Sequence, residues 1–248
     1  MTRDWRQDRY LVRCEWGPVG AASVSGDAVV VVDVLSFTTA VTVLVERGTA
    51  VYPAAWDDVR AAELARSYDA ALAVARQEMS DDNPWSLSPA ALRRAPAPER
   101  LVLPSPNGSA IAAAAPGIVV AGCLRNATAV GRWLTERGFG RDRSVAVVPA
   151  GERWPDGSLR PALEDLLGAG AVLAALDLPG EVLSPEAAAA RASYAGLAEQ
   201  AVGDAVRSCG SGRELVDRGF ADDVEVALEV DASDVVPVLV DGCFGAGG

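Results

Sequence analysis

The sequence predicts an α/β fold with parallel strands at its centre, and three observations support this class. Residues 28–32 are an unbroken run of alanine and valine, typical of a strand buried on both faces of a parallel sheet. Strand-like and helix-like patterns alternate along the rest of the chain. Half of the 248 residues are hydrophobic, which is ample for a core. No repeat or linker divides the sequence, so we expect a single domain over residues 1–248.

The stretch from residue 27 to residue 48 contains the acidic residue around which we expect the site to form, Asp33. This residue ends the valine run, and Ser36 and Thr38 after it can begin a helix. Apolar residues then recur at helical spacing as far as Gly48. Ligands of open α/β sheets bind outside the carboxyl ends of strands, so Asp33 is a candidate site residue. The alternative is that it only caps the helix.

The remaining elements are expected in the following order. Strands are predicted at residues 10–14, 50–52, 71–75, 101–103, 118–121, 144–149 and 235–240, the last at a sheet edge because it contains Pro237. Helices are predicted at 57–67, after Ser109, from Asn126 or Thr128 to Arg137, and at 162–176, 184–208, 210–219 and 222–229. We expect a turn at 15–18 and a loop at 154–161. The proline-rich residues 79–98 are either a functional flap or a mobile excursion.

A loop of small residues precedes the helix after residue 109. Asn107, Gly108 and Ser109 offer amides and hydroxyls at a helix start, which is a favourable place for an anion. An ordinary strand-to-helix turn is the alternative. Arg125 lies at the next strand-to-helix junction and is a candidate clamp for phosphate or carboxylate oxygens, with Asn126 beside it as a further substrate-binding candidate.

Two carboxylates begin a helix that is otherwise apolar on all sides. Glu164 and Asp165 are the only charged residues between 163 and 176, so the helix is expected to be buried. Buried carboxylates need a cation, an arginine or the helix N-terminus to stay ionised, unless this turn faces solvent. Glu152 and Arg153 follow the strand at 144–149 and are further candidates at a strand end.

Composition narrows the possible chemistry. The chain has no histidine, and all 22 of its basic residues are arginine, which excludes histidine-based triads, the P-loop lysine and Schiff-base lysines. Hard-cation chemistry on an anionic substrate fits what remains. The net charge of −12 argues against nucleic acid or a membrane surface as a partner. The four cysteines lie far apart, and no apolar run suits a membrane span, so we expect a cytoplasmic protein with free thiols.

The chain resembles the ComB-like 2-phosphosulfolactate phosphatase family over nearly its whole length. The stretches that carry the resemblance are VVVVDVLSFTTAV (29–41), SPNGSAIA (105–112), GCLRNATAV (122–130), PAGERWPDGSLRPALEDLLGAGAVLAAL (149–176) and SGRELVDRGFADDVEVAL (211–228). The resemblance implies a three-layer α/β/α sandwich with a mostly parallel or mixed sheet. It also implies Mg²⁺-dependent hydrolysis of 2-phospho-3-sulfolactate to sulfolactate and phosphate. The expected partner is therefore a small phosphorylated anion, and a homodimer stays open.

The expected site follows from these residues together. Asp33, Glu164 and Asp165 are the candidate Mg²⁺ ligands and catalytic carboxylates, with Arg153 as a catalytic cation. The expected substrate-binding residues are Ser36, Asn107, Gly108, Ser109, Arg125, Asn126 and Glu152.

The sequence departs from the family pattern beside Asp33. Where the family usually has an arginine the chain has Ser36, so the site is one charge short unless another arginine, such as Arg76, replaces it. Two alternatives follow. The first is a small-anion-binding protein without catalysis on the same fold. The second is an isochorismatase-like cysteine hydrolase using Asp33 and Cys123, although that chemistry also needs a lysine.

Overall fold

A nine-stranded sheet organises the structure, a computed structural model that describes residues 4–24, 26–56 and 58–248. Among these residues the strand order is β1-β7-β2-β6-β10-β11-β3-β5-β4. The strands are β1 (Val12–Cys14), β2 (Ala28–Val32), β3 (Ala50–Ala55), β4 (Ala71–Leu72), β5 (Arg100–Ser105), β6 (Ile118–Gly122), β7 (Val145–Pro149), β10 (Pro237–Val240) and β11 (Cys243–Ala246). A separate small hairpin pairs β8 (Glu152–Arg153) with β9 (Leu159–Arg160).

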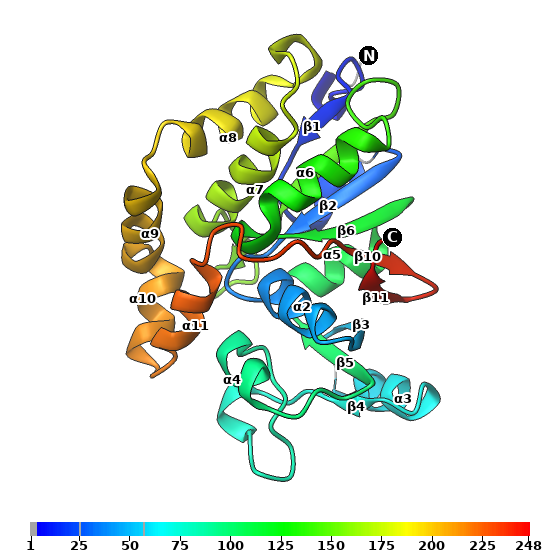
Figure 1. The fold of residues 1–248 in the computed structure, drawn as a ribbon, viewed down its shortest axis with the longest axis vertical. Helices are drawn as coiled ribbons and strands as arrows, with labels where there is room; N and C mark the ends of the chain where they lie inside the picture. Colours follow the sequence, from blue (N-terminus) through cyan, green and yellow to red (C-terminus); the bar gives the residue numbers. More distant parts are fainter. Residues whose placement is uncertain (1–3, 25, 57) are drawn as a thin grey trace.

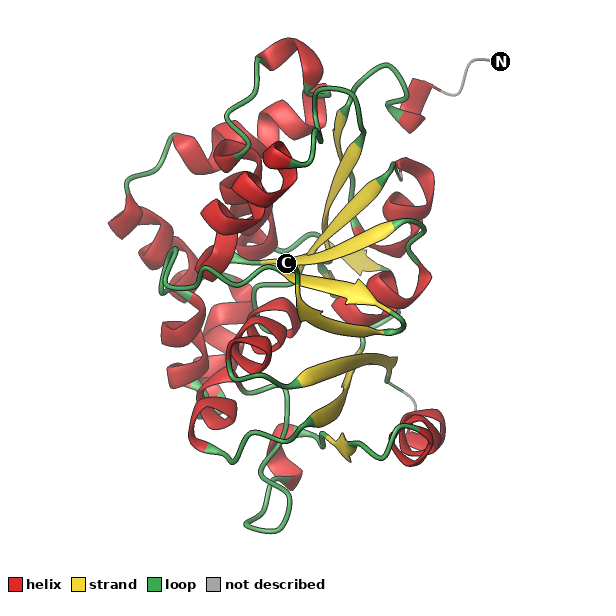
Figure 2. Ribbon diagram, turned by 45° about the vertical axis from the view of Figure 1, so that its right-hand side comes forward, coloured by secondary structure: helices red, strands yellow, loops and turns green. Residues whose placement is uncertain are grey.

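Helices cover both faces of the sheet, as Figures 1 and 2 show. They are α1 (Gly17–Val24), α2 (Phe37–Glu46), α3 (Asp58–Ser67), α4 (Pro89–Arg94), α5 (Gly108–Ala114), α6 (Ala127–Glu136), α7 (Leu163–Ala175), α8 (Pro185–Ala195), α9 (Glu199–Ser208), α10 (Gly210–Asp217) and α11 (Ala221–Ala227). Single 3₁₀ turns occur at η1 (Asp4–Arg6), η2 (Arg76–Glu78), η3 (Leu124–Asn126) and η4 (Gly180–Val182). In the part of the chain that the structure describes, every helix is too short or too polar to cross a bilayer.

Strand β2 lies at the centre of the core, as its valine run predicts. Val30 and Val32 point into a cluster that includes residues of α6, α7 and α8. Val29 and Val31 point the other way, into a cluster with α1, α2 and α5. Because both faces of one strand are fully covered, the architecture is the expected three-layer α/β/α sandwich.

The sheet is mixed, because a hairpin separates two groups of parallel strands. Strands β1, β7, β2 and β6 form one parallel group, and β3, β5 and β4 form the other. The antiparallel pair β10–β11 lies between them. The prediction of an edge strand at 235–240 is therefore wrong. Pro237 is the first residue of β10 and pairs only toward β11, and a strand tolerates proline at its first position.

Three other expectations were wrong in detail. The expected turn at 15–18 begins α1, since Pro18 occupies the first helical turn, where its missing N–H costs nothing. The loop at 79–98 contains α4, whose N-cap Ser88 accepts a hydrogen bond from Ala91 N at 3.1 Å. The helix expected at 184–208 is interrupted: α8 ends at Ala195, with Gly196 as its C-cap, and α9 starts at Glu199.

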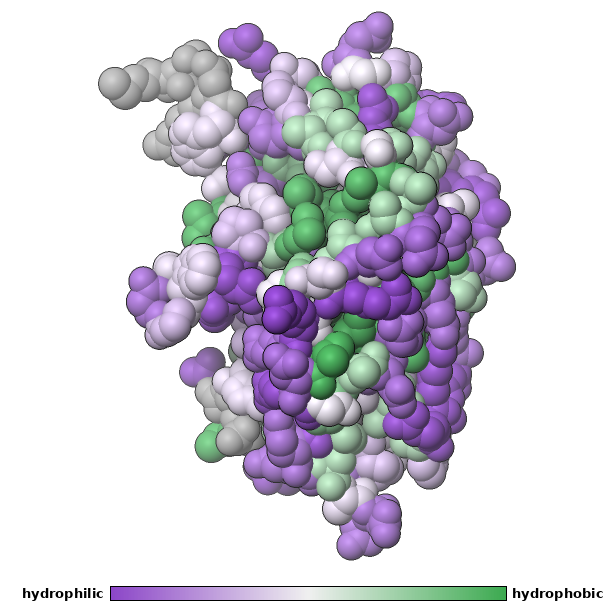
Figure 3. Space-filling view, turned by 90° about the vertical axis from the view of Figure 1, so that its left-hand side faces the viewer, coloured by the Kyte–Doolittle hydropathy of each residue, from purple (hydrophilic) through white to green (hydrophobic). Residues whose placement is uncertain are grey.

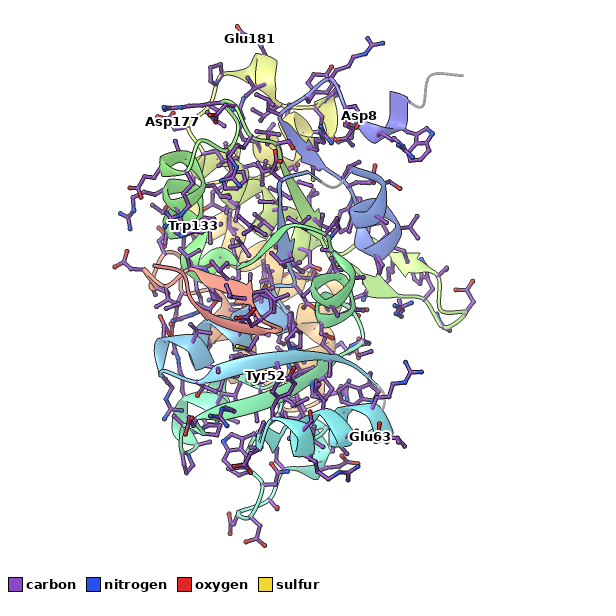
Figure 4. The ribbon with its side chains drawn as sticks, turned by 90° about the vertical axis from the view of Figure 1, so that its right-hand side faces the viewer. Asp8, Tyr52, Glu63, Trp133, Asp177 and Glu181 are labelled. Carbon is purple, nitrogen blue, oxygen red and sulfur yellow. The ribbon has the colours of Figure 1, made fainter. Side chains whose placement is uncertain are left out.

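Two regions flank the central layers. Tyr52 on β3 packs against α3 and stacks on Tyr68 with ring centroids 4.3 Å apart, on the side shown in Figure 4. Helices α8 to α11 cover the opposite side, where hydrophilic residues surround a band of hydrophobic ones (Figure 3). The central strands β2, β6 and β7 end at the same level, so their carboxyl ends lie side by side.

Candidate active site

Asp33 lies directly after β2, and two backbone N–H groups hold its carboxylate. Phe37 N donates to Oδ1 at 3.0 Å and Gly108 N donates to Oδ2 at 2.9 Å. A side chain at position 108 would place its Cβ 2.7 Å from Asp33 Oδ2 and 2.6 Å from the Phe37 ring. Glycine is therefore required here because the backbone approaches the carboxylate closely. Through the bond from Phe37 N, Asp33 caps the first turn of α2, which was the alternative to a site role. It also lines a cleft, so the two roles are compatible.

The pKa of Asp33 is raised, chiefly because the carboxyl is buried. The negative charge of Glu164 raises it further, whereas the two backbone N–H donors and Arg76 oppose the shift. A cation bound nearby would therefore stabilise the charged form of Asp33.

Glu164 and Asp165 reach the same place from the first turn of α7. Both side chains are 2% exposed, so this turn does not face solvent. Asp165 accepts hydrogen bonds from Val34 N at 2.7 Å and Gly151 N at 2.9 Å, and so joins the loops after β2 and β7. Burial and the charges of Asp33 and Glu164 raise the pKa of Asp165 well above its usual value. Glu164 contacts the thiol of Cys209, with Sγ 3.2 Å from Oε2.

A cleft of about 190 Å³ opens beside these carboxylates. Four residues expected from the sequence line this cleft: Asp33, Ser36, Asn107 and Glu152. Glu164 and Asp165 are not among its lining residues. The other polar residues of its wall are Arg76, Ser105, Ser211, Glu214 and Arg218. The cleft therefore combines carboxyl, hydroxyl and guanidinium groups from several segments of the chain.

Glu152 has the environment of a proton-transfer group. Asn107 Nδ2 donates to its Oε2 at 2.9 Å. Burial raises the pKa of Glu152 to about 7, and the charges of Asp33 and Glu164 add to the shift. A carboxyl that titrates near neutral pH inside a cleft can accept or release a proton during a reaction.

Arg76 places a guanidinium beside Ser36, the position at which the family usually has an arginine. Its Nη2 donates to Ser36 Oγ at 2.6 Å and to Leu87 O at 3.0 Å. Its Nε donates to Asp223 Oδ2 at 3.0 Å, and the Asp223 side chain is only 1% exposed. The guanidinium is thus held at the cleft from a segment 40 residues away from Ser36.

Several expected residues have other partners. Arg153 is exposed at the rim, where it donates to Gly157 O and Pro106 O. Arg125 is buried against Glu46 and Glu229 and does not line the cleft. Asn126 is also buried, and its side chain bonds the backbone of Cys123, Ala121 and Val235.

The loop at 105–109 does not form the open amide cradle that its small residues suggested. The N–H of Gly108 is bound by Asp33, and the hydroxyl of Ser109 donates to Ser105 O at 2.6 Å. Of the three candidates in this loop, Asn107, Gly108 and Ser109, only Asn107 lines the cleft, together with the neighbouring Ser105 and Pro106. The Gly108 N–H and the Ser109 hydroxyl are therefore used in hydrogen bonds within the protein, where they stabilise the fold.

Helix α10 contributes cleft residues that our sequence reasoning did not select. Ser211, Glu214, Leu215 and Arg218 all line the cleft. They are spaced i, i+3, i+4 and i+7, so they share one helix face. This spacing was readable in the sequence, but nothing in it indicated that the face would turn toward Asp33.

The donor set fits Mg²⁺ held by few protein ligands. Within the described residues, no three carboxylate or thiol side chains are placed to hold one metal ion. Mg²⁺ takes one or two carboxylates and completes its shell with water or phosphate oxygens. Asp33 and Glu164 suit this role, since the negative charge of Glu164 acts on the Asp33 carboxyl and a cation between them would offset it. Asp165 is a third candidate ligand and, like Asp33, accepts a backbone N–H hydrogen bond on each oxygen.

The thiol that the cysteine-hydrolase alternative requires lies inside the core. Cys123 is 0% exposed, and burial raises its pKa. Its Sγ is 3.6 Å from Thr42 Oγ1, and the residue does not line the cleft. A protonated, inaccessible thiol is a poor nucleophile, so we do not pursue this alternative.

Comparison with known proteins agrees with the resemblance in the sequence. Residues 19–242 match the family described as 2-phosphosulpholactate phosphatase. The chain is 35% identical over 143 residues to a 2-phosphosulfolactate phosphatase from Methanothermobacter thermautotrophicus. This alignment covers 57% of the chain and 57% of the length of that relative. Since the family match covers most of the chain and all of the cleft residues, the protein belongs to the 2-phosphosulpholactate phosphatase family.

Proposed function

We propose that this protein is a Mg²⁺-dependent phosphomonoester hydrolase acting on a phosphorylated 2-hydroxy acid. The family suggests 2-phospho-3-sulfolactate, which would yield 3-sulfolactate and phosphate. The observation that carries the proposal is that Asp33, Glu152 and Arg76 line one cleft, beside the buried carboxyls of Glu164 and Asp165. A phosphate dianion is repelled by carboxylates unless a cation reverses the local field.

Asp33 and Glu164 would hold the metal ion. When bound, Mg²⁺ would neutralise phosphate charge and acidify water near the phosphorus atom. Asp165 keeps the backbone at Val34 and Gly151 in place, so the loops after β2 and β7 stay fixed relative to each other. This rigidity positions the reacting groups before substrate arrives.

The other cleft residues bind and transfer protons. Arg76 faces the substrate as the guanidinium that pairs with phosphate or carboxylate oxygens. Glu152 accepts a proton from attacking water or returns one to the leaving alcohol, and Asn107 fixes its orientation. The reaction breaks the ester P–O bond, and water supplies the hydroxyl on phosphate and the proton on the alcohol.

Phosphate release from 2-phospho-3-sulfolactate tests the proposal. We expect turnover with Mg²⁺ and none in EDTA. Asp33→Asn should lower kcat/KM by roughly a hundredfold or more, since even residues that only support metal ligands cost 10–100-fold. Asp142→Asn is the matched control, because Asp142 is exposed in the turn before β7, at the end opposite to Asp33.

Two results would count against the proposal. Equal activity in EDTA, or in Asp33→Asn, would remove the metal–carboxylate mechanism. Tight binding of the phosphorylated acid without turnover would instead favour the non-catalytic anion-binding alternative.

A further inference from the structure

A second hollow adjoins the cleft, with a volume of about 350 Å³. We call it the side chamber. Its apolar wall includes Trp56, Val74, Leu87 and Pro106, and the guanidinium-bearing residues Arg76 and Arg218 lie where it meets the cleft. Leu87, Pro106 and the two arginines line both spaces, so the chamber and the cleft share a wall.

Each arginine of this shared wall has a carboxylate partner. Arg76 Nε is 3.0 Å from Asp223 Oδ2, and Arg218 Nη1 is 3.1 Å from Glu214 Oε1. Among the described residues that line the chamber, the remaining side chains are apolar apart from Gln77. Because both arginines also line the cleft, where the proposed function places the phosphate and carboxylate, the other described residues of the chamber wall offer an anionic group no side-chain cation, whereas an apolar group there would lose only water contacts.

We propose that the side chamber binds an apolar, preferably aromatic, substituent on C3 of the substrate. This inference rests on the proposed function, because it places the phosphate and carboxylate in the cleft beside Asp33 and Arg76. The substrate class is then the phosphomonoesters of 2-hydroxy acids with an apolar side chain. Trp56, which is 49% exposed, offers its ring as a stacking surface in the chamber.

The reaction is the same for this substrate class. With 2-phospho-3-phenyllactate as the probe, water adds to phosphorus and the ester P–O bond breaks. The alcohol oxygen takes a proton from water, and the products are 3-phenyllactate and inorganic phosphate. No oxidant or further reactant is needed.

Relative kcat/KM values for three esters test the inference. The esters are 2-phospholactate, 2-phospho-3-sulfolactate and 2-phospho-3-phenyllactate, all with Mg²⁺. We expect the phenyl ester to exceed the other two by about tenfold, the usual effect of a filled hydrophobic pocket. Trp56→Ala should lower its kcat/KM by about tenfold while lowering that of 2-phospholactate much less. Trp5→Ala is the matched control, because Trp5 is similarly exposed at 57% and lines neither space.

A preference for the sulfonated ester would overturn the inference, as would an equal loss on all three esters in Trp56→Ala. The proposed function can fail separately, if no ester is hydrolysed. Calorimetric titration of the same three esters then decides the matter. Tighter binding of the phenyl ester that is weakened in Trp56→Ala supports the side chamber, and equal binding of all three esters refutes it.

Discussion

Single carboxylates in this site differ in what holds them. Asp33 and Asp165 each accept two backbone N–H groups, which tie together loops that are far apart in the sequence. Glu152 has one side-chain donor, Asn107, and lines the cleft. The first two residues are therefore tied into the backbone framework, whereas Glu152 is freer to change its protonation during a reaction.

Glu152→Gln should change both activity and the pH dependence of stability. The native pKa is raised from 4.5 to about 7, so the folded protein holds this proton more tightly than the unfolded chain. The contribution of Glu152 to the free energy of unfolding is thus fully present below about pH 4.5 and is lost as the pH rises through about 7. Without divalent cations, the variant should therefore gain stability relative to the wild type at about pH 8 but not at about pH 4.5.

Urea unfolding at these two pH values measures the effect, and phosphate release measures the expected loss of activity. Glu63→Gln is the control, since Glu63 is exposed on α3 (Figure 4) and should leave the pH dependence of the wild type unchanged. A constant stability difference between Glu152→Gln and the wild type at both pH values would contradict the assignment.

Whole elements were predictable where one local pattern decided them. The buried strand β2 and the buried helix α7 followed from continuous apolar runs, and the structure confirms both. The prediction that β10 lies at a sheet edge was wrong. A proline at the first residue of an inner strand and a proline inside an edge strand cannot be distinguished in the sequence. Helix α4 was missed because the prolines around it suggested a loop.

Asp223 joins three elements that we expect to act together. It lies in the first turn of α11 and accepts hydrogen bonds from Ser88 Oγ at 2.5 Å, Ala90 N at 3.2 Å and Arg76 Nε at 3.0 Å. It therefore holds α4 and the guanidinium at the cleft in one arrangement. We regard Asp223 as a positioning residue for Arg76.

Asp223→Asn should destabilise the protein and weaken substrate binding. Removing one partner of a buried ion pair leaves the other charge uncompensated, so the free energy of unfolding should fall by about 3 kcal/mol. KM should rise because Arg76 loses its fixed position, with a smaller change in kcat. The neighbouring Asp222 is 79% exposed and 3.6 Å from Arg94, so Asp222→Asn should change stability by at most about 0.5 kcal/mol. Equal effects in the two variants, by urea unfolding and steady-state kinetics, would refute this role.

At the scale of the whole molecule, local sequence patterns predicted some of the residues that lie together but not the long-range contacts of the arginines. Asp33, Asn107 and Glu152 line one cleft, and Asp165 lies behind it, hydrogen-bonded to the backbone after β2 and β7. Their role as a catalytic site stays a prediction. The contact of Arg76 with Ser36 could only be suggested, because no local pattern states which distant segment supplies a missing charge. Arg125 was misplaced for the same reason: its position after β6 is right, but Glu46 and Glu229 hold its side chain away from the cleft.

Cation binding should be visible in the stability of the entire molecule. The chain carries a net charge of −12, and its buried carboxylates repel one another in the site. A Mg²⁺ ion that binds the native state alone adds about 2.7 kcal/mol to the free energy of unfolding at a hundredfold excess over Kd. For a domain of this size, we expect Tm to rise by about 5 °C or more.

Thermal unfolding in EDTA and in increasing Mg²⁺ measures this rise in Tm. Screening of the net negative charge also stabilises the fold, so every Mg²⁺ concentration is matched with NaCl of equal ionic strength. The rise should exceed the NaCl effect, saturate, and be lost in Asp33→Asn while Asp142→Asn retains it. An identical rise with NaCl, or an undiminished one in Asp33→Asn, would mean that Mg²⁺ acts on the surface charge and not at the carboxylates beside the cleft.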